Sequence, residues 1–239
     1  MTMFRERFET YFQFGAPIDA GRMKLRRSDE FLDLAQGLYK ETVLRCSTGL
    51  RAVAHISEGD LVMTFDHGFR PVVAVERFSF ARLGRDLPEE FWPLRLPPGL
   101  FGNAGERFVA PDQCLMIESD LAEAEYGDPF VLVPGKVLAL LPQVERTRPG
   151  PERAIHRLRF DRPELVVTNQ GAVLLCDTGS FFDDWQNLVP DEDLGQLLTY
   201  TALPFDMAAD LLRREILRDG GIDAHLQKHL ARMTARMAN

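Results

Sequence analysis

The sequence predicts a mainly β protein. It indicates a compact antiparallel β domain at residues 41–182, a helical lead-in at residues 1–40 and an α-helical extension at residues 183–239. In the central region the apolar runs are short and rich in β-branched residues, and Gly, Pro and Asp turns separate them, as is typical of antiparallel strands. In the last region apolar residues recur with a helical period instead. Long helices do not alternate with the strands, so we do not expect a doubly wound parallel sheet.

The lead-in carries a helical pattern. Phe4, Phe8 and Phe12 recur at a spacing of four, which would place three rings on one face of a helix. Ser28 is followed by two acidic residues, the pattern of an N-cap with negative charge in the first helical turn. These features predict a helix-rich N-terminal region.

The central region contains several segments with the composition of strands. We expect strands at Val43–Arg45, Leu61–Phe65, Val72–Phe78, Gln113–Ile117, Phe130–Val133, Lys136–Leu141, Ala154–Phe160, Glu164–Thr168 and Ala172–Cys176.

Two tight turns interrupt these strands. Gly59 tolerates a positive φ, and the carboxylate of Asp60 can accept hydrogen bonds from nearby backbone amides. Asp66 and Gly68 flank His67 in a second turn of the same kind. We interpret these residues as determinants of the fold.

The C-terminal region has two amphipathic stripes. Leu211, Leu212 and Ile216 mark the first, and Gly220–Gly221 ends that helix. A second stripe follows at Leu226, Leu230, Met233 and Met237. The stripes could pack on the β domain, mediate self-association or bind a protein partner.

The charge composition argues against binding to nucleic acid. The net charge is -8 and the pI is near 5.2, whereas binding to a nucleic acid backbone needs concentrated Lys and Arg. The basic patch Arg22–Arg27 is followed directly by acids, so we interpret it as a solvated charge cluster. We expect no nucleic acid partner.

The cysteine pattern and the apolar runs indicate the cellular environment. The chain has 3 cysteines without CxxC spacing, which does not indicate a disulfide scaffold. The first residues lack the apolar core of a signal peptide, and no apolar run approaches the ~20 residues that cross a bilayer. We therefore expect a cytoplasmic protein without a membrane partner.

The run TVLRCSTGLRAVAHISEGDLVMTFDHGFRPV, from Thr42 to Val72, resembles the opening of the Hint (Hedgehog/intein) domain in its bacterial Hint-2-type form. Four further blocks follow in the family's order: FWPLRLPPGLFG, FVAPDQCLMI, DPFVLVPGKVLA and AIHRLRFDRPELVVTNQGAVLLCDTG. The resemblance covers about residues 40–180 and implies a Hint-like β domain. Positions of the opening pattern are occupied by Arg51, Val53, Ile56, Gly59, Asp60, Val62, Thr64, Asp66 and Gly68.

The resemblance also implies a chemistry. Active members cleave themselves: a Cys or Ser attacks the carbonyl of the preceding residue, and a histidine protonates the leaving amine. Here Gly37 stands in the nucleophile's place, Gln113 in the place of that histidine, and Pro163 in the place of another histidine. We therefore expect a domain without self-processing activity, acting as a structural or protein-interaction module and not as an enzyme.

An autocatalytic alternative stays open. Cys46 or Cys114 could cleave the chain by an N–S acyl shift, with a relocated proton donor such as His55, His67 or His156. In the other interpretation each cysteine, Cys176 included, is a small apolar side chain that packs in the domain.

The last helix carries two histidines, His225 and His229, at a spacing that could share a metal ion. A HExxH pattern and an obvious third ligand are missing from the sequence. We therefore interpret both as solvent-exposed side chains at the helix edge, and we expect no metal and no cofactor.

Overall fold

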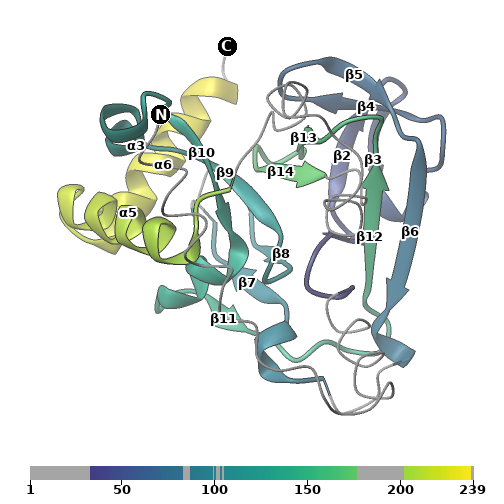
Figure 1. Cartoon of the computed structure of the whole chain (residues 1–239), viewed down its shortest axis with the longest axis horizontal. Coiled ribbons are helices and arrows are strands. Elements are labelled where there is room, and N and C mark those ends of the chain that lie inside the picture. Colours follow the sequence, from purple (N-terminus) through teal and green to yellow (C-terminus); the bar gives the residue numbers. More distant parts are fainter. Residues whose placement is uncertain are drawn as a thin grey trace, which may run out of the picture. The chain divides into compact units, whose positions relative to one another are not determined.

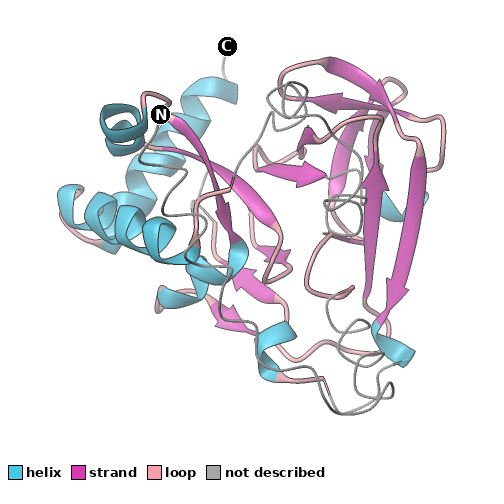
Figure 2. Cartoon of the chain, viewed as in Figure 1, coloured by secondary structure: helices cyan, strands magenta, loops and turns pink. Residues whose placement is uncertain are grey.

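The computed structural model describes residues 33–82, 87–98, 100, 103, 105–176 and 202–237. Strands dominate the part up to residue 176, and helices the part after residue 202 (Figure 2). The helix expected from Phe4, Phe8 and Phe12, the Ser28 cap and the basic patch lie outside the described residues.

The described strands form three sheets, and every strand ladder among them is antiparallel (Figure 1). The predicted fold class, a mainly antiparallel β protein with C-terminal helices, is confirmed. The largest sheet has eight strands, in the spatial order β10 (Phe130–Pro134), β9 (Cys114–Glu118), β14 (Val173–Cys176), β13 (Glu164–Val167), β4 (Leu61–Thr64), β2 (Val43–Cys46) and β3 (Gly49–Ala52), with β5 (Gly68–Pro71) paired to β4.

Two smaller sheets complete the β structure. The first has the order β1 (Leu38–Tyr39), β12 (Ala154–Arg159) and β6 (Ala74–Ser79), and the second has the order β11 (Glu145–Arg146), β7 (Leu94–Leu96) and β8 (Arg107–Val109). The described helices are α3 (Asp120–Tyr126), α5 (Phe205–Arg218), α6 (Ile222–Met237) and the short 3₁₀ helices η1 (Val53–His55), η2 (Phe80–Arg82), η3 (Glu89–Phe91) and η5 (Gly135–Leu140).

The segment Lys136–Leu141 was expected as a strand, and that prediction is wrong: residues Gly135–Leu140 form η5. Val137 and Leu138 are consecutive, yet both are fully buried. Successive side chains of a strand point to opposite faces, whereas a tight helical turn can bury two neighbours against one surface. The apolar composition indicates a buried segment, but it does not distinguish a strand from a 3₁₀ helix.

The turn before β4 has the predicted chemistry. Gly59 adopts a φ of +85°, in the left-handed region that glycine tolerates. The backbone N–H of Ser57 donates to Asp60 Oδ2 over 2.8 Å, and Arg51 Nη1 lies 2.7 Å from Asp60 Oδ1. The hydrogen bond from Ser57 and the pairing with Arg51 hold the pKa of Asp60 below its usual value.

The turn after β4 is closed by a side chain. The hydroxyl of Thr64 donates to the carbonyl of Gly68 over 2.9 Å and accepts from the N–H of His67 over 3.2 Å. Gly68 adopts a φ of +66°. Thr64 therefore fixes the reversal from β4 into β5, which agrees with its interpretation as a fold residue.

The main core lies between the β structure and α5. Strand residues such as Leu44, Leu115 and Val166 belong to the same buried cluster as Leu211 and Leu212 of α5. Burying a side chain of this size contributes about 1.5–3 kcal/mol. The predicted first stripe of the C-terminal region therefore packs on the β domain.

The residues directly before α5 join the largest sheet. Ala202 forms an isolated bridge with Leu132 of β10, and the N–H of Leu203 donates to the carbonyl of Leu132 over 2.8 Å. Ile222 and Leu226 of α6 also pack against the main core. None of the described helices combines the length and the apolar character of a membrane span.

Candidate functional site

Gly37 and Gln113, which are 76 residues apart in the sequence, meet in the structure. The backbone N–H of Gly37 donates to Gln113 Oε1 over 3.0 Å, and the contact is buried. Gly37 lies directly before β1, and Gln113 lies directly before β9. The two positions that the sequence pattern singles out are therefore one site.

The side-chain amide of Gln113 is fixed on both sides. Its Nε2 donates to the carbonyl of Leu175 over 2.7 Å and to the carbonyl of Cys114 over 3.0 Å. Because only the amino group can donate to two carbonyls, the oxygen must face Gly37. Gln113 is about 1% exposed, so water does not compete for these bonds.

The other end of the same peptide group is held by Arg157. Arg157 Nε donates to the carbonyl oxygen of Gln36 over 3.2 Å, and its Nη1 lies 3.0 Å from Asp33 Oδ1. The guanidinium also lies over the ring of Phe78, at 4.7 Å from the centroid. We call the Gln36–Gly37 peptide group with Gln113 and Arg157 the peptide clamp.

The peptide clamp leaves no room for a side chain on residue 37. Gly37 adopts a φ of +126°, and a Cβ placed there would lie 2.4 Å from Ile155 Cγ2 and 3.0 Å from the carbonyl of His156. Contacts under 3.0 Å are essentially never made by real Cβ atoms. Both the backbone conformation and the packing therefore require glycine here.

Pro163 lies next to a buried acid. It precedes Glu164, which starts β13 and is fully buried. The carboxylate of Glu164 lies 2.9 Å from His67 Nδ1 and 3.5 Å from Arg70 Nε. This arrangement ties the β4–β5 hairpin to β13, so His67 contacts a structural carboxylate.

Cys46 occupies the interior of the largest sheet. It is 3% exposed on β2, where it pairs with Gly49 and Val62 on the neighbouring strands. Burial raises the pKa of the Cys46 thiol, Arg51 lowers it, and Asp60 raises it further. A thiol with a raised pKa is a poor nucleophile near neutral pH, since the thiolate is the reactive form.

Cys114 lies beside the peptide clamp and is half-buried. Its carbonyl accepts a hydrogen bond from Gln113 Nε2, and its Sγ lies 3.9 Å from the carbonyl of Asp112. Cys176 is buried at the end of β14, as expected for a packing residue. Of the three cysteines, Cys114 is the one whose backbone accepts a hydrogen bond from the clamp.

The candidate proton donors differ in their surroundings. His156 is buried on β12 and pairs with Leu38 in register, one residue from Gly37. Burial lowers its pKa, and the charges of Arg77 and Lys40 lower it further, so its imidazole is neutral at pH 7. His55 ends η1 and is exposed.

The sequence drew attention to Gly37 and Gln113 but missed Arg157. Its position in the middle of β12 gives no sign that the guanidinium reaches back to the carbonyl of Gln36. That contact depends on the pairing of β1 with β12 across more than 100 residues.

The chain belongs to the Hint domain family. The family model matches residues 36–179, more than half of the chain, and the match begins at Gln36 within the peptide clamp. This confirms the resemblance found in the sequence.

The chain is also similar, at low sequence identity, to solved structures of inteins and intein-like domains. The crystal structure of the MchDnaB-1 intein is similar at 16% identity, with 57% of this chain and 98% of that chain covered and a TM-score of 0.34. The solution structure of a bacterial intein-like domain from Clostridium thermocellum is similar at 14% identity, with 58% and 97% covered and a TM-score of 0.33. The comparison with curated proteins gave no match.

Proposed function

We propose that the chain is a Hint domain protein without self-processing activity, which acts as a structural or protein-interaction module. The observation that carries the proposal is the glycine at position 37, inside the peptide clamp. An acyl shift at this peptide needs an oxygen or sulfur on residue 37 that attacks the carbonyl carbon of Gln36. Glycine has neither atom.

The packing around Gly37 supports the same conclusion. A cysteine at this position would require a φ that L-residues rarely adopt and would push against Ile155. Ile155 and the backbone of His156 occupy the space in which the side chain of a nucleophile would lie. A single substitution would therefore not restore the reaction.

Gln113 is also unsuited to the chemistry. The amine that leaves in an acyl shift must gain a proton, and a carboxamide does not titrate near neutral pH. Gln113 Oε1 accepts from the N–H of Gly37, which stabilises the intact peptide group. At the third position Pro163 has no ionisable side chain. We infer that the peptide clamp now holds the start of the domain in place.

An exposed apolar face supports an interaction role. Leu61 begins β4 and Phe65 follows its last residue, both on the face opposite the buried Val62. Phe69 of β5 pairs with Met63, which lies between them. Leu61, Phe65 and Phe69 are between 39% and 43% exposed. Exposed apolar patches of this kind are typical of surfaces that bind other proteins.

The alternative function is self-cleavage by a cysteine-mediated N–S acyl shift. Cys114 gives it some support, because the clamp contacts this residue directly. Cys46 gives less support, because its thiol is buried and its pKa is raised. In this reaction the thiolate would form a thioester with the preceding carbonyl carbon, and the released amine would take a proton.

The two functions differ in the covalent state of the chain. The purified full chain should be incubated between pH 6 and pH 9, with and without dithiothreitol or hydroxylamine, and followed by intact-mass spectrometry. We expect one species at 27.1 kDa throughout, because the clamp lacks a nucleophile.

Fragments that accumulate with time would contradict the proposal. The residue responsible would follow from Cys46→Ala and Cys114→Ala, with Cys176→Ala as the matched control, since Cys176 is a buried strand residue like Cys46. Cleavage that one of the first two variants abolishes and the control retains would establish the alternative.

A further inference from the structure

The connection between α5 and α6 folds the end of one helix back onto the other. Asp219 caps α5, and Gly220 and Gly221 follow with φ values of +89° and +117°. The N–H of Gly221 donates to the carbonyl of Ile216, and the N–H of His225 donates to the carbonyl of Gly221. Because two consecutive left-handed residues reverse the chain, the carboxylate of Asp219 lies over the first turns of α6.

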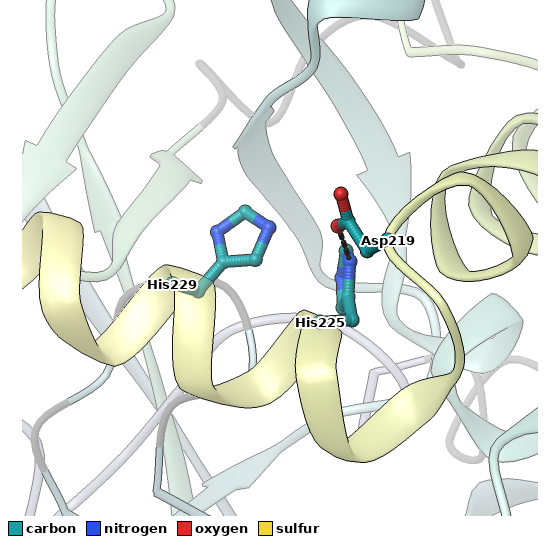
Figure 3. Close-up of side chains that lie close together, drawn as sticks. All are labelled: Asp219, His225 and His229. Atoms are coloured by element: carbon teal, nitrogen blue, oxygen red, sulfur yellow. Dashed lines mark hydrogen bonds and ion pairs between the residues drawn. The ribbon is translucent and has the colours of Figure 1, made fainter.

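This reversal places an acid beside the two histidines of α6 (Figure 3). His225 Nδ1 lies 2.7 Å from Asp219 Oδ2, and the ring centroids of His225 and His229 are 4.4 Å apart. One ligand atom from each of the three residues lies within 4.8 Å of the others. The third ligand that the sequence did not reveal is therefore supplied by the helix cap.

The cluster is buried, which corrects the expectation of solvent-exposed histidines. His225 is 2% exposed and His229 is 8% exposed, and the Asp219 side chain is also 8% exposed. The spacing of four placed both histidines on one helix face as expected, but that face points toward α5 and the main core. The carboxylate and the two imidazoles therefore lie together in a region largely closed to water.

We propose that Asp219, His225 and His229 form a binding site for a divalent transition metal ion of the Zn²⁺ type. Two imidazoles and one carboxylate form a donor set that suits Zn²⁺, Co²⁺, Ni²⁺ or Fe²⁺, whereas Ca²⁺ and Mg²⁺ prefer sites made of oxygen atoms. Three protein ligands leave a further position for water or another group.

The present geometry is close to that of a metal-bound site. Ligand atoms at about 2.0–2.1 Å from a tetrahedral ion lie roughly 3.4 Å from one another. The pair of His225 Nδ1 and Asp219 Oδ2 must open slightly from 2.7 Å, and the widest separation in the cluster must close. The ion would replace the proton shared by this pair, and that proton would pass to solvent.

Lys228 approaches the opposite oxygen of the carboxylate. Its Nζ donates to Asp219 Oδ1 over 2.6 Å, whereas His225 pairs with Oδ2. The ammonium can therefore keep its bond when Oδ2 binds the ion. Carboxylate ligands are commonly held in this way by a second hydrogen-bonding group. The positive charge of Lys228 also limits the affinity, so we expect a weaker site than one with an unpaired carboxylate.

The test uses the full chain without an affinity tag, treated with a chelator and then dialysed. Zn²⁺ is titrated by calorimetry, and Co²⁺ is followed by its visible absorption, which reports a tetrahedral site with nitrogen ligands. We expect saturable binding of one ion per chain. In Asp219→Asn and His229→Gln the affinity should fall by more than the roughly 10–100-fold that loss of an outer hydrogen-bonding partner of a ligand costs. His55→Gln, in an exposed histidine on η1, should bind as the wild type does.

A wild-type protein that takes up neither ion in a saturable way would overturn the proposal. So would equal binding by the wild type and both site variants, or a loss confined to His55→Gln. Circular dichroism shows whether each variant is folded. If Asp219→Asn unfolds because the charged pairing with Lys228 and His225 is lost, His229→Gln and the wild-type Co²⁺ spectrum still decide the outcome.

Discussion

At the scale of single residues, the peptide clamp combines groups that polarise a peptide with a residue that cannot attack it. Arg157 donates to the carbonyl of Gln36, and Gln113 accepts from the N–H of Gly37. In an active site the contact from Arg157 would assist attack on the carbonyl carbon, whereas an acceptor at the N–H would not help the amine to leave. Here both contacts satisfy a buried backbone group, and an unsatisfied one would cost about 1–3 kcal/mol.

Gly37 can be tested against a matched glycine. Gly37→Ala combines an unfavourable φ with a steric conflict at Ile155, whereas Gly49→Ala has a similar φ of +111° and open space around its Cβ. The left-handed conformation costs roughly 1–2 kcal/mol in both variants. Overpacking should add about 1–3 kcal/mol in Gly37→Ala alone.

Urea denaturation of the two variants measures this difference. We expect the free energy of unfolding to fall in both and to fall further in Gly37→Ala. Equal losses would mean that the space beside Ile155 adapts to a side chain. The clamp would then lack a nucleophile only because glycine carries no oxygen or sulfur.

The sequence indicated some residues of the two sites and not others. Gly37 and Gln113 emerged from the family resemblance, because the pattern fixes their order along the chain. Arg157 did not emerge, since it reaches its site through the long-range pairing of β1 with β12. Asp219 was missed although it lies only 6 residues from His225, because the sequence does not show how the chain reverses between them. For His225 and His229 the spacing was informative about the helix face, but their burial depends on the turn at Gly220–Gly221.

At the scale of secondary structure elements, α5 is attached to the β domain by a buried acid. Glu215 is 4% exposed, and its Oε1 accepts from the hydroxyl of Ser119 over 2.6 Å and from the N–H of Leu121 over 3.2 Å. Ser119 is the N-cap of α3, and its hydroxyl also accepts from the N–H of Ala122. One carboxylate therefore completes the cap of a neighbouring helix.

Removing this carboxylate should destabilise the protein. Glu215→Ala leaves the hydroxyl of Ser119 and the N–H of Leu121 without their acceptor in a buried setting. Hydrogen bonds to a charged group contribute about 1.5–3 kcal/mol, so we expect a loss of about 3 kcal/mol in the free energy of unfolding. Chemical denaturation measures it, and hydrogen exchange should show faster exchange in α3 and α5.

Arg213→Ala is the control on the same helix, because the Arg213 side chain is 71% exposed and pairs with an exposed acid. Its effect should stay within about 0.5 kcal/mol. If both variants behaved alike, the attachment of α5 would depend on apolar packing and not on Glu215.

Most strands of four to six residues were predicted, but the four-residue strands β3 and β5 were missed. β4, β12 and β14 lie within the ranges expected from their apolar content. The two- and three-residue strands β1, β7, β8 and β11 were missed, because so few residues carry no periodic signal and pairing alone defines them. The helix α3 was also missed, although Ser119 and the following acids form a recognisable N-terminus.

At the scale of the whole molecule, the C-terminal helices belong to the same buried core as the β domain. Ala208, Leu211 and Leu212 of α5 are buried, and Ile222 and Leu226 of α6 pack partly against the same cluster. The proposed metal site would join the two helices at their connection. Helix α5 is therefore part of the folded β domain, and α6 adds further apolar contacts to the same core.

The two uses of α6, packing on its own domain or self-association, predict different masses. Because Ile222 and Leu226 already contact the core, we expect the full chain to be a monomer near 27.1 kDa by size-exclusion chromatography with light scattering. A chain that ends at Gly220 should keep α5, expose the surface under α6 and self-associate more readily. It should also unfold at a lower temperature.

Point variants separate this packing from the general effect of truncation. Leu226→Ala removes part of the contact with the core and should cost about 1–2 kcal/mol, because a fully buried leucine contributes about 1.5–3 kcal/mol and this one is partly buried. Leu217→Ala, at a side chain 67% exposed on α5, should change little. The opposite result would be a dimeric full chain that becomes monomeric on truncation and in Leu226→Ala. Because the monomers would stay folded, the lost contact would be one between two copies. That result would assign α6 to an interface between two copies of the chain.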